Sequence, residues 1–253
     1  MRSLPSKTGR PLVIAHRGAK AYKPENTLAA FALAVEQGAD MIETDLHLTR
    51  DKAVPISHDA TLERFGREGE IADVELEELR SISLASHDPE KHKGAYEGIP
   101  TLAEMLDRFG EVIPFNLEIK TTASHKPYPG LQKMALDHVV ERGLLDRTLF
   151  SSFSDAVLAE LRELEPRVRL GVLEEWDAPE GIFDRAEAVA AESINPYFVN
   201  VTTELVERAH DKNLAVYVYT VNEIAKMEEL LAMGVDGIIS NKPDALKTVV
   251  DGR

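Results

Sequence analysis

The chain contains no cysteine, which excludes disulfide frameworks, thiolate zinc sites, iron–sulfur clusters and cysteine nucleophiles. Basic residues are scarce, because 29 Lys and Arg stand against 44 Asp and Glu, a formal net charge of −15. This balance argues against a sequence-independent grip on nucleic acid and against an anionic membrane surface, since both rely on Lys and Arg. The hydrophobic content of 43% is nevertheless enough for a full core in a chain of 253 residues.

Long apolar runs are also missing. No run approaches the ~18 consecutive apolar residues of a membrane span. The first apolar run, 12–15, stops at His16 and Arg17, and no small-residue cleavage site follows it. A secretory signal needs an apolar stretch of ~7–15 residues. We therefore expect a cytoplasmic protein with no stable membrane association and no nucleic-acid partner.

Short β-branched runs alternate along the chain with stretches of helical period. The expected strands cover residues 11–15, 41–48, 112–119, 148–152, 169–173, 194–198, 215–220 and 237–240. The expected helices cover residues 28–37, 131–142, 155–164, 182–191, 203–212, 223–233 and 243–250. Eight strand–helix units in ~250 residues predict a TIM (β/α)8 barrel. A doubly wound open sheet is the alternative, weakened because no G-x-G-x-x-G follows the first strand.

Two segments depart from this repeat. Residues 54–57 read as a further strand, but only the short segment 49–53 separates them from the strand before. A parallel crossover needs a dozen or more residues, so these two runs are expected to form a hairpin. Residues 60–111 are expected to be an insertion between the second and third barrel strands. We expect one domain, covering residues 10–253.

Acidic side chains gather at strand ends, where a TIM barrel builds its active site. Glu43 and Asp45 are two apart on one strand, so they point to the same side, ~6.6 Å apart along it. Such carboxylates repel each other unless a cation neutralises them. A hard divalent ion accepts oxygen ligands and can bridge the pair, with Glu118 as a third ligand. The alternative is that these acids pair with Lys120 and Arg17 in a stabilising network.

Two histidines also follow strands, His16 after the first strand and His58 after the hairpin arm. Histidine titrates nearest neutrality, so the pair can serve as general base and general acid. The alternative is that each ring is a hydrogen-bonded filler. Arg17 and Lys120 suit a phosphate bound partly through a metal ion and partly through the cations. Their alternative role is charge balance for the acids.

The other histidines and two aromatic residues carry weaker signals. His47 continues the inward side of its strand, and we expect it to pack or to support a neighbour of the site. Solvated surface is the expected place of the remaining five histidines, which are His87, His92, His125, His138 and His210. Trp176 and Tyr219 are candidates for the barrel mouth, with core packing as the alternative.

The same residues form an ordered set of motifs from about residue 12 to 247. The motifs include HRG at 16–18, PENTLAAF at 24–31, GADMIETD at 38–45, HDATLER at 58–64, LEIK at 117–120 and GVDGIISN at 234–241. This set closely resembles the glycerophosphodiester phosphodiesterase family. One departure is Ser240-Asn241-Lys242-Pro243, where Thr-Asp is commoner before the final Pro, and Asn241 cannot supply a carboxylate.

The resemblance implies a TIM barrel with a small insertion between strands two and three. It implies hydrolysis of a small-molecule glycerophosphodiester to sn-glycerol 3-phosphate and an alcohol, with Mg²⁺ or Ca²⁺. By matching position, the resemblance assigns metal binding to Glu43, Asp45 and Glu118, acid–base catalysis to His16 and His58, and phosphate binding to Arg17 and Lys120. A homodimer is compatible with these expectations.

Three other functions compete with hydrolysis of soluble diesters such as glycerophosphocholine. A lysophospholipase D-like enzyme would want an apolar rim, and residues 60–98 contain no such apolar stretch. A barrel that only binds would have lost a histidine or a metal carboxylate, and none is lost. A metal-dependent aldolase barrel fits the carboxylates but leaves the histidine pair without a role.

Overall fold

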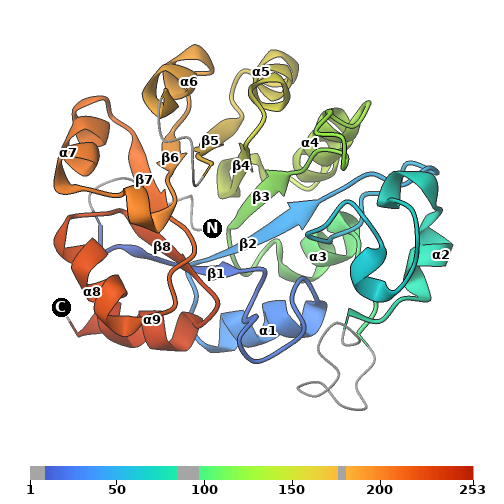
Figure 1. Ribbon diagram of the computed structural model, residues 1–253, viewed down its shortest axis with the longest axis horizontal. Coiled ribbons are helices and arrows are strands. Elements are labelled where there is room, and N and C mark those ends of the chain that lie inside the picture. Colours follow the sequence, from blue (N-terminus) through green and yellow to red (C-terminus); the bar gives the residue numbers. More distant parts are fainter. Residues whose placement is uncertain (1–8, 85–96, 176–180, 253) are drawn as a thin grey trace.

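The computed structural model describes residues 9–84, 97–175 and 181–252. Eight parallel strands close into one barrel in sequence order, with helices around the outside (Figure 1). The strands are β1 (Leu12–His16), β2 (Met41–Leu46), β3 (Phe115–Ile119), β4 (Thr148–Ser152), β5 (Arg169–Leu173), β6 (Ser193–Asn195), β7 (Ala215–Val218) and β8 (Gly237–Ser240). The expected TIM barrel is confirmed, and closure between β1 and β8 rules out the open sheet.

The barrel helices follow the strands, and short helices fill the connections. The α-helices are α1 (Leu28–Glu36), α2 (Leu76–Arg80), α3 (Leu102–Phe109), α4 (Leu131–Glu141), α5 (Asp155–Leu164), α6 (Ile182–Ala188), α7 (Thr203–Asp211), α8 (Ile224–Ala232) and α9 (Pro243–Asp251). The 3-10 helices are η1 (Glu63–Phe65), η2 (Ile71–Asp73), η4 (Leu145–Arg147) and η5 (Phe198–Asn200). Within the described ranges, no helix combines the length and the apolar character that crossing a membrane requires.

Alternation along each strand separates the core from the site. Outward-facing residues such as Ile42 and Leu46 of β2 join the main core between the strands and the helices. Inward-facing apolar residues fill the lower barrel, namely Leu12, Ile14, Met41, Leu149, Ala215, Tyr217 and Ile239. Above them the inward positions become polar, because Glu43 lies beside His16 and Asp45 lies beside Glu118 in the strand register. A layer of buried apolar side chains therefore lies beneath a layer of charged side chains at the C-terminal ends of the strands.

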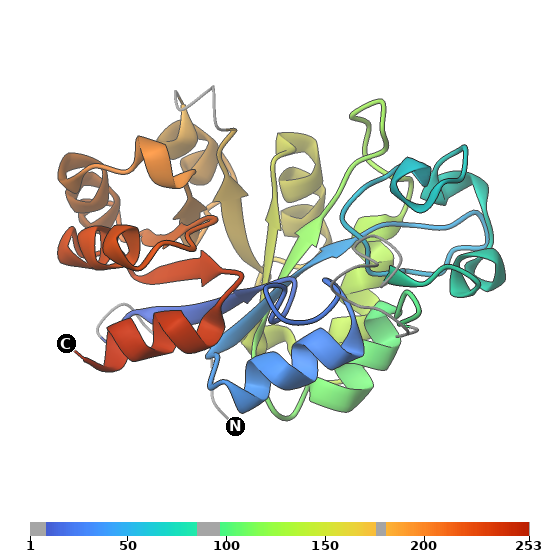
Figure 2. The same cartoon turned by 60° about the horizontal axis from the view of Figure 1, so that its bottom comes forward.

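The expected hairpin is present directly after β2. Leu46 and Ile56 form an antiparallel bridge, and the Ser57 amide donates to the Asp45 carbonyl at 3.1 Å. This turn brings His58 back to the end of β2. The connection to β3 then extends to one side of the barrel (Figure 2).

The insertion expected over residues 60–111 contains two kinds of structure. Its first part has a small core of its own, made of Leu62, Ile71, Leu79, Ile82, Leu84 and Ile99. Its last helix, α3, buries an apolar face in the main core through Leu102, Met105, Leu106 and Phe109. The helix α3 thus serves as the barrel helix that precedes β3.

Four expected strands were too long. Residues 112–114 lie outside β3, because the amides of Val112 and Ile113 close the end of α3 by donating to the Phe109 carbonyl. The strand expected over 194–198 ends at Asn195. Pro196 follows there, and its missing N–H interrupts the ladder, which resumes only as an isolated bridge between Tyr197 and Tyr219. The expected strands 41–48 and 215–220 likewise end early, at Leu46 and Val218.

Candidate active site

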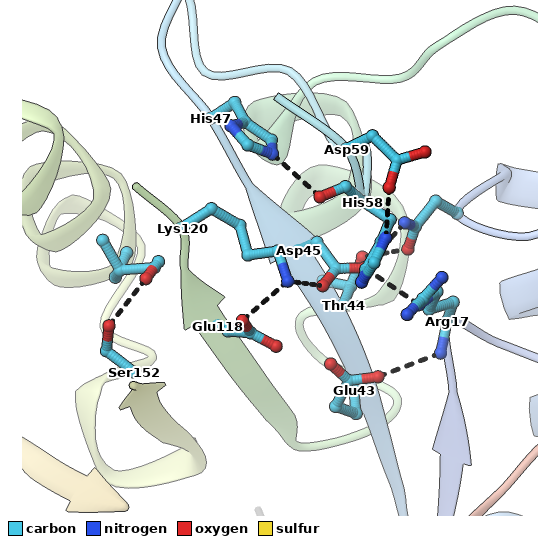
Figure 3. Close-up of polar contacts among 12 residues, drawn as sticks. Arg17, Glu43, Thr44, Asp45, His47, His58, Asp59, Glu118, Lys120 and Ser152 are labelled. Atoms are coloured by element: carbon cyan, nitrogen blue, oxygen red, sulfur yellow. Dashed lines mark hydrogen bonds and ion pairs between the residues drawn. The ribbon is translucent and has the colours of Figure 1, made fainter. Parts of the chain in front are cut away.

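Three buried carboxylates meet at the ends of β2 and β3 (Figure 3). Glu43, Asp45 and Glu118 each place one carboxylate oxygen within 4.8 Å of the others. Burial, followed by the charges of Asp45 and Glu118, raises the pKa of Glu43 well above its usual value. A carboxyl group in that state favours a cation beside it. The donor set is three hard oxygen ligands, which fits Mg²⁺ or Ca²⁺.

Two cations contact the same carboxylates. Arg17 places Nε 3.2 Å from an Asp45 oxygen, and its backbone amide donates to Glu43 at 3.1 Å. Lys120 donates to Glu118 at 2.7 Å and lies 3.3 Å from the other Asp45 oxygen. Although burial acts to raise the pKa of Asp45, Lys120 and Arg17 hold it well below its usual value. The three carboxylates thus form the acidic cluster and also contact Arg17 and Lys120. Glu43 is the carboxylate whose negative charge is least compensated.

His16 ends β1 and turns its ring toward the cluster. Its Nδ1 lies 2.6 Å from the side-chain amide oxygen Oδ1 of Asn241, so Nδ1–H donates and Nε2 keeps its lone pair. That Nε2 lies 3.9 Å from a Glu43 oxygen. Burial, followed by the charges of Arg17 and Lys20, lowers the pKa of His16 well below its usual value. His16 is therefore neutral, with its basic nitrogen turned toward the carboxylates.

His58 lies opposite, after the hairpin arm, with a charged partner. Its Nδ1 is 2.6 Å from an Asp59 oxygen, and this hydrogen bond is the main cause that lowers the pKa of Asp59 to about 2. The His58 carbonyl also accepts from Nε2 of His47 at 3.1 Å. His47 in turn accepts from the Tyr128 hydroxyl at 2.7 Å, and burial lowers its pKa to about 4. His47 thus supports the backbone of His58, as expected, in its neutral form.

Glu25 connects the two sides of the site. It accepts from Arg17 at 3.2 Å and from Arg64 at 2.8 Å, and it pairs with Lys20. Arg64, from η1, also lies 3.1 Å from Asp59. Although burial acts to raise the pKa of Glu25, Arg17, Lys20 and Arg64 hold it far below its usual value. The sequence placed Glu25 within a motif but gave it no role, because Arg64, which joins it to Asp59, comes from a segment 39 positions further along.

The turn after β1 requires glycine. Gly18 has a φ of +78°, in a backbone region that residues other than glycine rarely adopt. A Cβ atom there would come within 2.7 Å of the Ala30 backbone. The absence of a side chain at Gly18 therefore lets α1 approach the turn that carries His16 and Arg17.

Two cavities adjoin the candidate residues. The first, of about 310 Å³, is lined by His16, Arg17 and Glu43, and also by Tyr219, which thus lies at the barrel mouth. The second, of about 570 Å³, is lined by His47 and His125. Residues common to both linings are His58, Glu118, Lys120 and Phe153. The two cavities therefore meet where the catalytic candidates lie.

The structure brings all seven candidates for catalysis, metal binding and phosphate binding together at this mouth. Of the histidines expected on the surface, His125 is exposed but lines the larger cavity, whereas His138 and His210 lie on α4 and α7. His87, His92 and Trp176 lie outside the described residues. Asn241 was missed as a partner of His16, and its signal was the departure from the family pattern at 240–243.

Comparisons with known proteins agree with this geometry. Residues 16–245 match the model of the glycerophosphoryl diester phosphodiesterase family. A glycerophosphodiester phosphodiesterase of Caldanaerobacter subterraneus subsp. tengcongensis is 34% identical, over 95% of this chain and 98% of its own. A Bacillus subtilis enzyme of the same name is 32% identical, over 96% of this chain and 87% of its own.

A solved structure gives the same result in three dimensions. An Oleispira antarctica phosphodiesterase, in complex with the product sn-glycerol-3-phosphate, superimposes with a TM-score of 0.80. It is 28% identical, and the match covers 96% of this chain and 97% of that one. The chain is therefore a phosphoric diester hydrolase and belongs to the glycerophosphoryl diester phosphodiesterase family.

Proposed function

We propose that this enzyme hydrolyses glycerophosphodiesters to sn-glycerol 3-phosphate and an alcohol, with a divalent cation and two histidines. The observation that carries the proposal is the arrangement of three buried carboxylates within 4.8 Å, flanked by the oriented rings of His16 and His58. The sn-glycerol-3-phosphate bound to the Oleispira antarctica phosphodiesterase supports the same product.

The metal ligands in this proposal are Glu43, Asp45 and Glu118. The raised pKa of Glu43, caused by burial and then by repulsion from Asp45 and Glu118, is the physical reason, because a cation beside the cluster stabilises its charged form. A bound divalent ion supplies charge withdrawal from a phosphate oxygen and a lower pKa for a bound hydroxyl group or water. The choice between Mg²⁺ and Ca²⁺ stays open.

The two rings have different partners. Nδ1 of His16 donates to the side-chain amide oxygen of Asn241, which leaves its Nε2 to remove the proton of the nucleophile. Nδ1 of His58 is held by the Asp59 carboxylate, and we assign to His58 the donation of a proton to the leaving alkoxide. The nucleophile is either the glycerol 2-hydroxyl, through a cyclic phosphate, or water.

Arg17 and Lys120 bind the phosphate in this proposal. Each already contacts a carboxylate of the cluster, so each is fixed before the substrate arrives. Their positive charges offset the charge that develops on the phosphate oxygens, without any rearrangement of the site.

The decisive experiment is the release of sn-glycerol 3-phosphate from glycerophosphocholine in Mg²⁺, in Ca²⁺ or in EDTA. We expect product with at least one cation and a loss of at least ~10²-fold in EDTA, the scale of a metal contribution. His16→Ala and Glu43→Ala should each lower kcat by ~10² or more. No product with any cation contradicts the proposal, and near-normal turnover of a variant contradicts its assigned role.

Lysophosphatidylcholine tests the lysophospholipase D-like alternative in the same assay. Faster release of choline from this lipid than from glycerophosphocholine would favour that alternative. The expected cytoplasmic location and the homodimer stay predictions, which cell fractionation and light scattering would test.

A further inference from the structure

The two cavities differ in which reacting groups they reach. His16 and Glu43 line only the smaller one, whereas His58 and Lys120 line both. A phosphodiester has two alcohol arms, one on each side of the phosphorus. The meeting point of the cavities, at Lys120 and Glu118, therefore suits the phosphate, with one arm in each cavity.

The acid–base roles decide which arm goes where, so this step rests on the proposed function. His58 protonates the leaving oxygen, and it also lines the larger cavity of about 570 Å³. His16 acts at the smaller cavity of about 310 Å³, where the arm that keeps the phosphate must lie. The glycerol arm then occupies the smaller cavity and the departing alcohol occupies the larger one.

Two buried polar side chains in the lining of the smaller cavity have no role in the proposed hydrolysis. Asn116 of β3 is 1% exposed, and neither atom of its amide has a hydrogen-bond partner in the part of the chain that the structure describes. Ser151 of β4 is also 1% exposed, and its hydroxyl is equally unpartnered there. Buried polar groups without partners are costly and uncommon, so both point to a ligand.

Their place in the barrel puts them beside the metal candidates. Asn116 is the strand neighbour of Glu43, and Ser151 is the strand neighbour of Glu118. The lining of the same cavity also includes apolar side chains, Phe153, Leu173 and Ile239 among others. The cavity thus offers an amide, a hydroxyl and an apolar surface for C–H groups.

We propose that Asn116 and Ser151 are specificity-determining residues that hydrogen-bond the free hydroxyl groups of the glycerol arm. The amide both donates and accepts, as a hydroxyl group does, and the carbon chain of the glycerol contacts the apolar side chains of the lining. The ligand class is a three-carbon polyol phosphate with an unsubstituted terminal hydroxyl group. A site built this way rejects an analogue without that hydroxyl group, because its own buried polar atoms would stay unpaired.

The test combines a change in the substrate with a change in the enzyme. The holoenzyme is assayed with glycerophosphocholine and with an analogue whose terminal glycerol hydroxyl is replaced by hydrogen. We expect the wild-type kcat/KM to be at least ~10-fold lower for the analogue. Asn116→Leu should lower kcat/KM for glycerophosphocholine and reduce the preference between the two substrates to below ~3-fold, and Ser151→Ala should act in the same direction.

Thr121→Val is the matched control, because Thr121 lines only the larger cavity and the substitution conserves its shape. This variant should keep the wild-type preference. A wild-type enzyme without preference, or Asn116→Leu with the full preference, overturns the inference. Thermal unfolding checks that each variant folds, and Ser151→Ala, which removes a single oxygen, serves if Asn116→Leu does not.

A binding measurement separates this inference from the proposed function. Titration calorimetry compares sn-glycerol 3-phosphate with the phosphate of 1,2-propanediol, in the presence of Mg²⁺ or Ca²⁺. Tighter binding of sn-glycerol 3-phosphate by ~10-fold, lost in Asn116→Leu, supports the subsite even if no diester is hydrolysed. Equal binding of the two phosphates by the wild-type protein overturns it, whatever the turnover assay gives.

Discussion

The stability of the protein should change in opposite directions when two buried glutamates of the site, Glu43 and Glu25, lose their charge. Glu43 is 5% exposed and Glu25 is 7% exposed, so both are equally removed from water. Glu43 faces two carboxylates, whereas Glu25 faces three cations. In metal-free protein near pH 7.5 we expect Glu43→Gln to raise the free energy of unfolding and Glu25→Gln to lower it.

The size of each effect follows from the distances. One carboxylate pair at 4.8 Å repels by roughly 3 kcal/mol at an effective dielectric constant of about 20, and Arg17 offsets part of it. A net gain of about 1 to 2 kcal/mol for Glu43→Gln corresponds to a rise in Tm of roughly 2 to 8 °C in a chain of this size. Breaking a buried pair costs about 3 to 5 kcal/mol, so Glu25→Gln should lower Tm by roughly 6 °C or more.

The pH dependence has a definite sign for each group. The pKa of Glu43 is raised in the folded state, so its contribution to stability is complete below the ordinary value of 4.5 and is lost as pH rises through the raised pKa. The pKa of Glu25 is lowered, so its contribution is present above 4.5 and is lost as pH falls through the lowered pKa. The advantage of Glu43→Gln over wild type should therefore grow with rising pH.

The assay is thermal unfolding of both variants and wild type in EDTA from pH 5 to 8, repeated with Mg²⁺ or Ca²⁺. The cation should stabilise wild type by about 2.7 kcal/mol at 100 times its Kd, and Glu43→Gln should reduce this gain. Glu36→Gln is the control, because Glu36 is exposed on α1 and should change Tm little. A metal-free Glu43→Gln protein that is less stable than wild type would refute the reasoning, because it would show that the carboxylates do not repel one another.

Other variants test the orientation of the two rings and the turn after β1. Asp59→Asn removes the carboxylate that orients His58, so kcat for glycerophosphocholine should fall roughly 10- to 100-fold with little change in KM, and an unchanged kcat in steady-state assays would dismiss the orienting role. Asn241→Asp places a charged acceptor beside Nδ1 of His16, which should raise the pKa of His16. The acidic limb of the pH profile of kcat/KM should then move to higher pH, and a limb that stays in place would contradict the contact. Gly18→Ala forces a Cβ atom against the Ala30 backbone at a positive φ, so we expect at least about 2 kcal/mol of destabilisation by chemical denaturation, whereas wild-type stability would mean that the turn relaxes freely.

The sequence predicted the barrel because each strand has its own apolar run and a helical pattern follows most of them. It predicted the carboxylate cluster because the period of two along β2 places Glu43 and Asp45 on one side. Helix α3 was absorbed into the expected insertion, because the sequence before it does not separate the small core of the insertion from the main core. The sequence therefore predicts elements that follow a periodic pattern better than it predicts domain boundaries that depend on packing.

Several site residues were invisible for a different reason. Glu25 gains its role from Arg64, which lies 39 positions further along the chain, and Asn241 gains its role from His16, 225 positions away. Asn116 reads as an ordinary polar residue in a strand until the closed barrel shows that its amide lines a cavity. Asn241 reaches His16 because β8 pairs with β1 in the closed barrel, and the other roles likewise depend on contacts between segments that are separate in the sequence.

The pairing of the charged side chains determines the sign of the charge at the site. Ion pairs link four carboxylates, Glu25, Asp45, Asp59 and Glu118, with four cations, Arg17, Lys20, Arg64 and Lys120, whereas Glu43 lies 3.9 Å from the neutral ring of His16. Each fixed cation has a carboxylate partner, and Glu43 is left with the raised pKa. Without a metal ion, the uncompensated charge repels a phosphodiester, whereas a divalent ion at the cluster reverses it. We therefore expect the affinity for sn-glycerol 3-phosphate to fall at least ~10-fold in EDTA for wild type and less for Glu43→Gln, and equal metal dependence of the two by calorimetry would contradict this account of the charge.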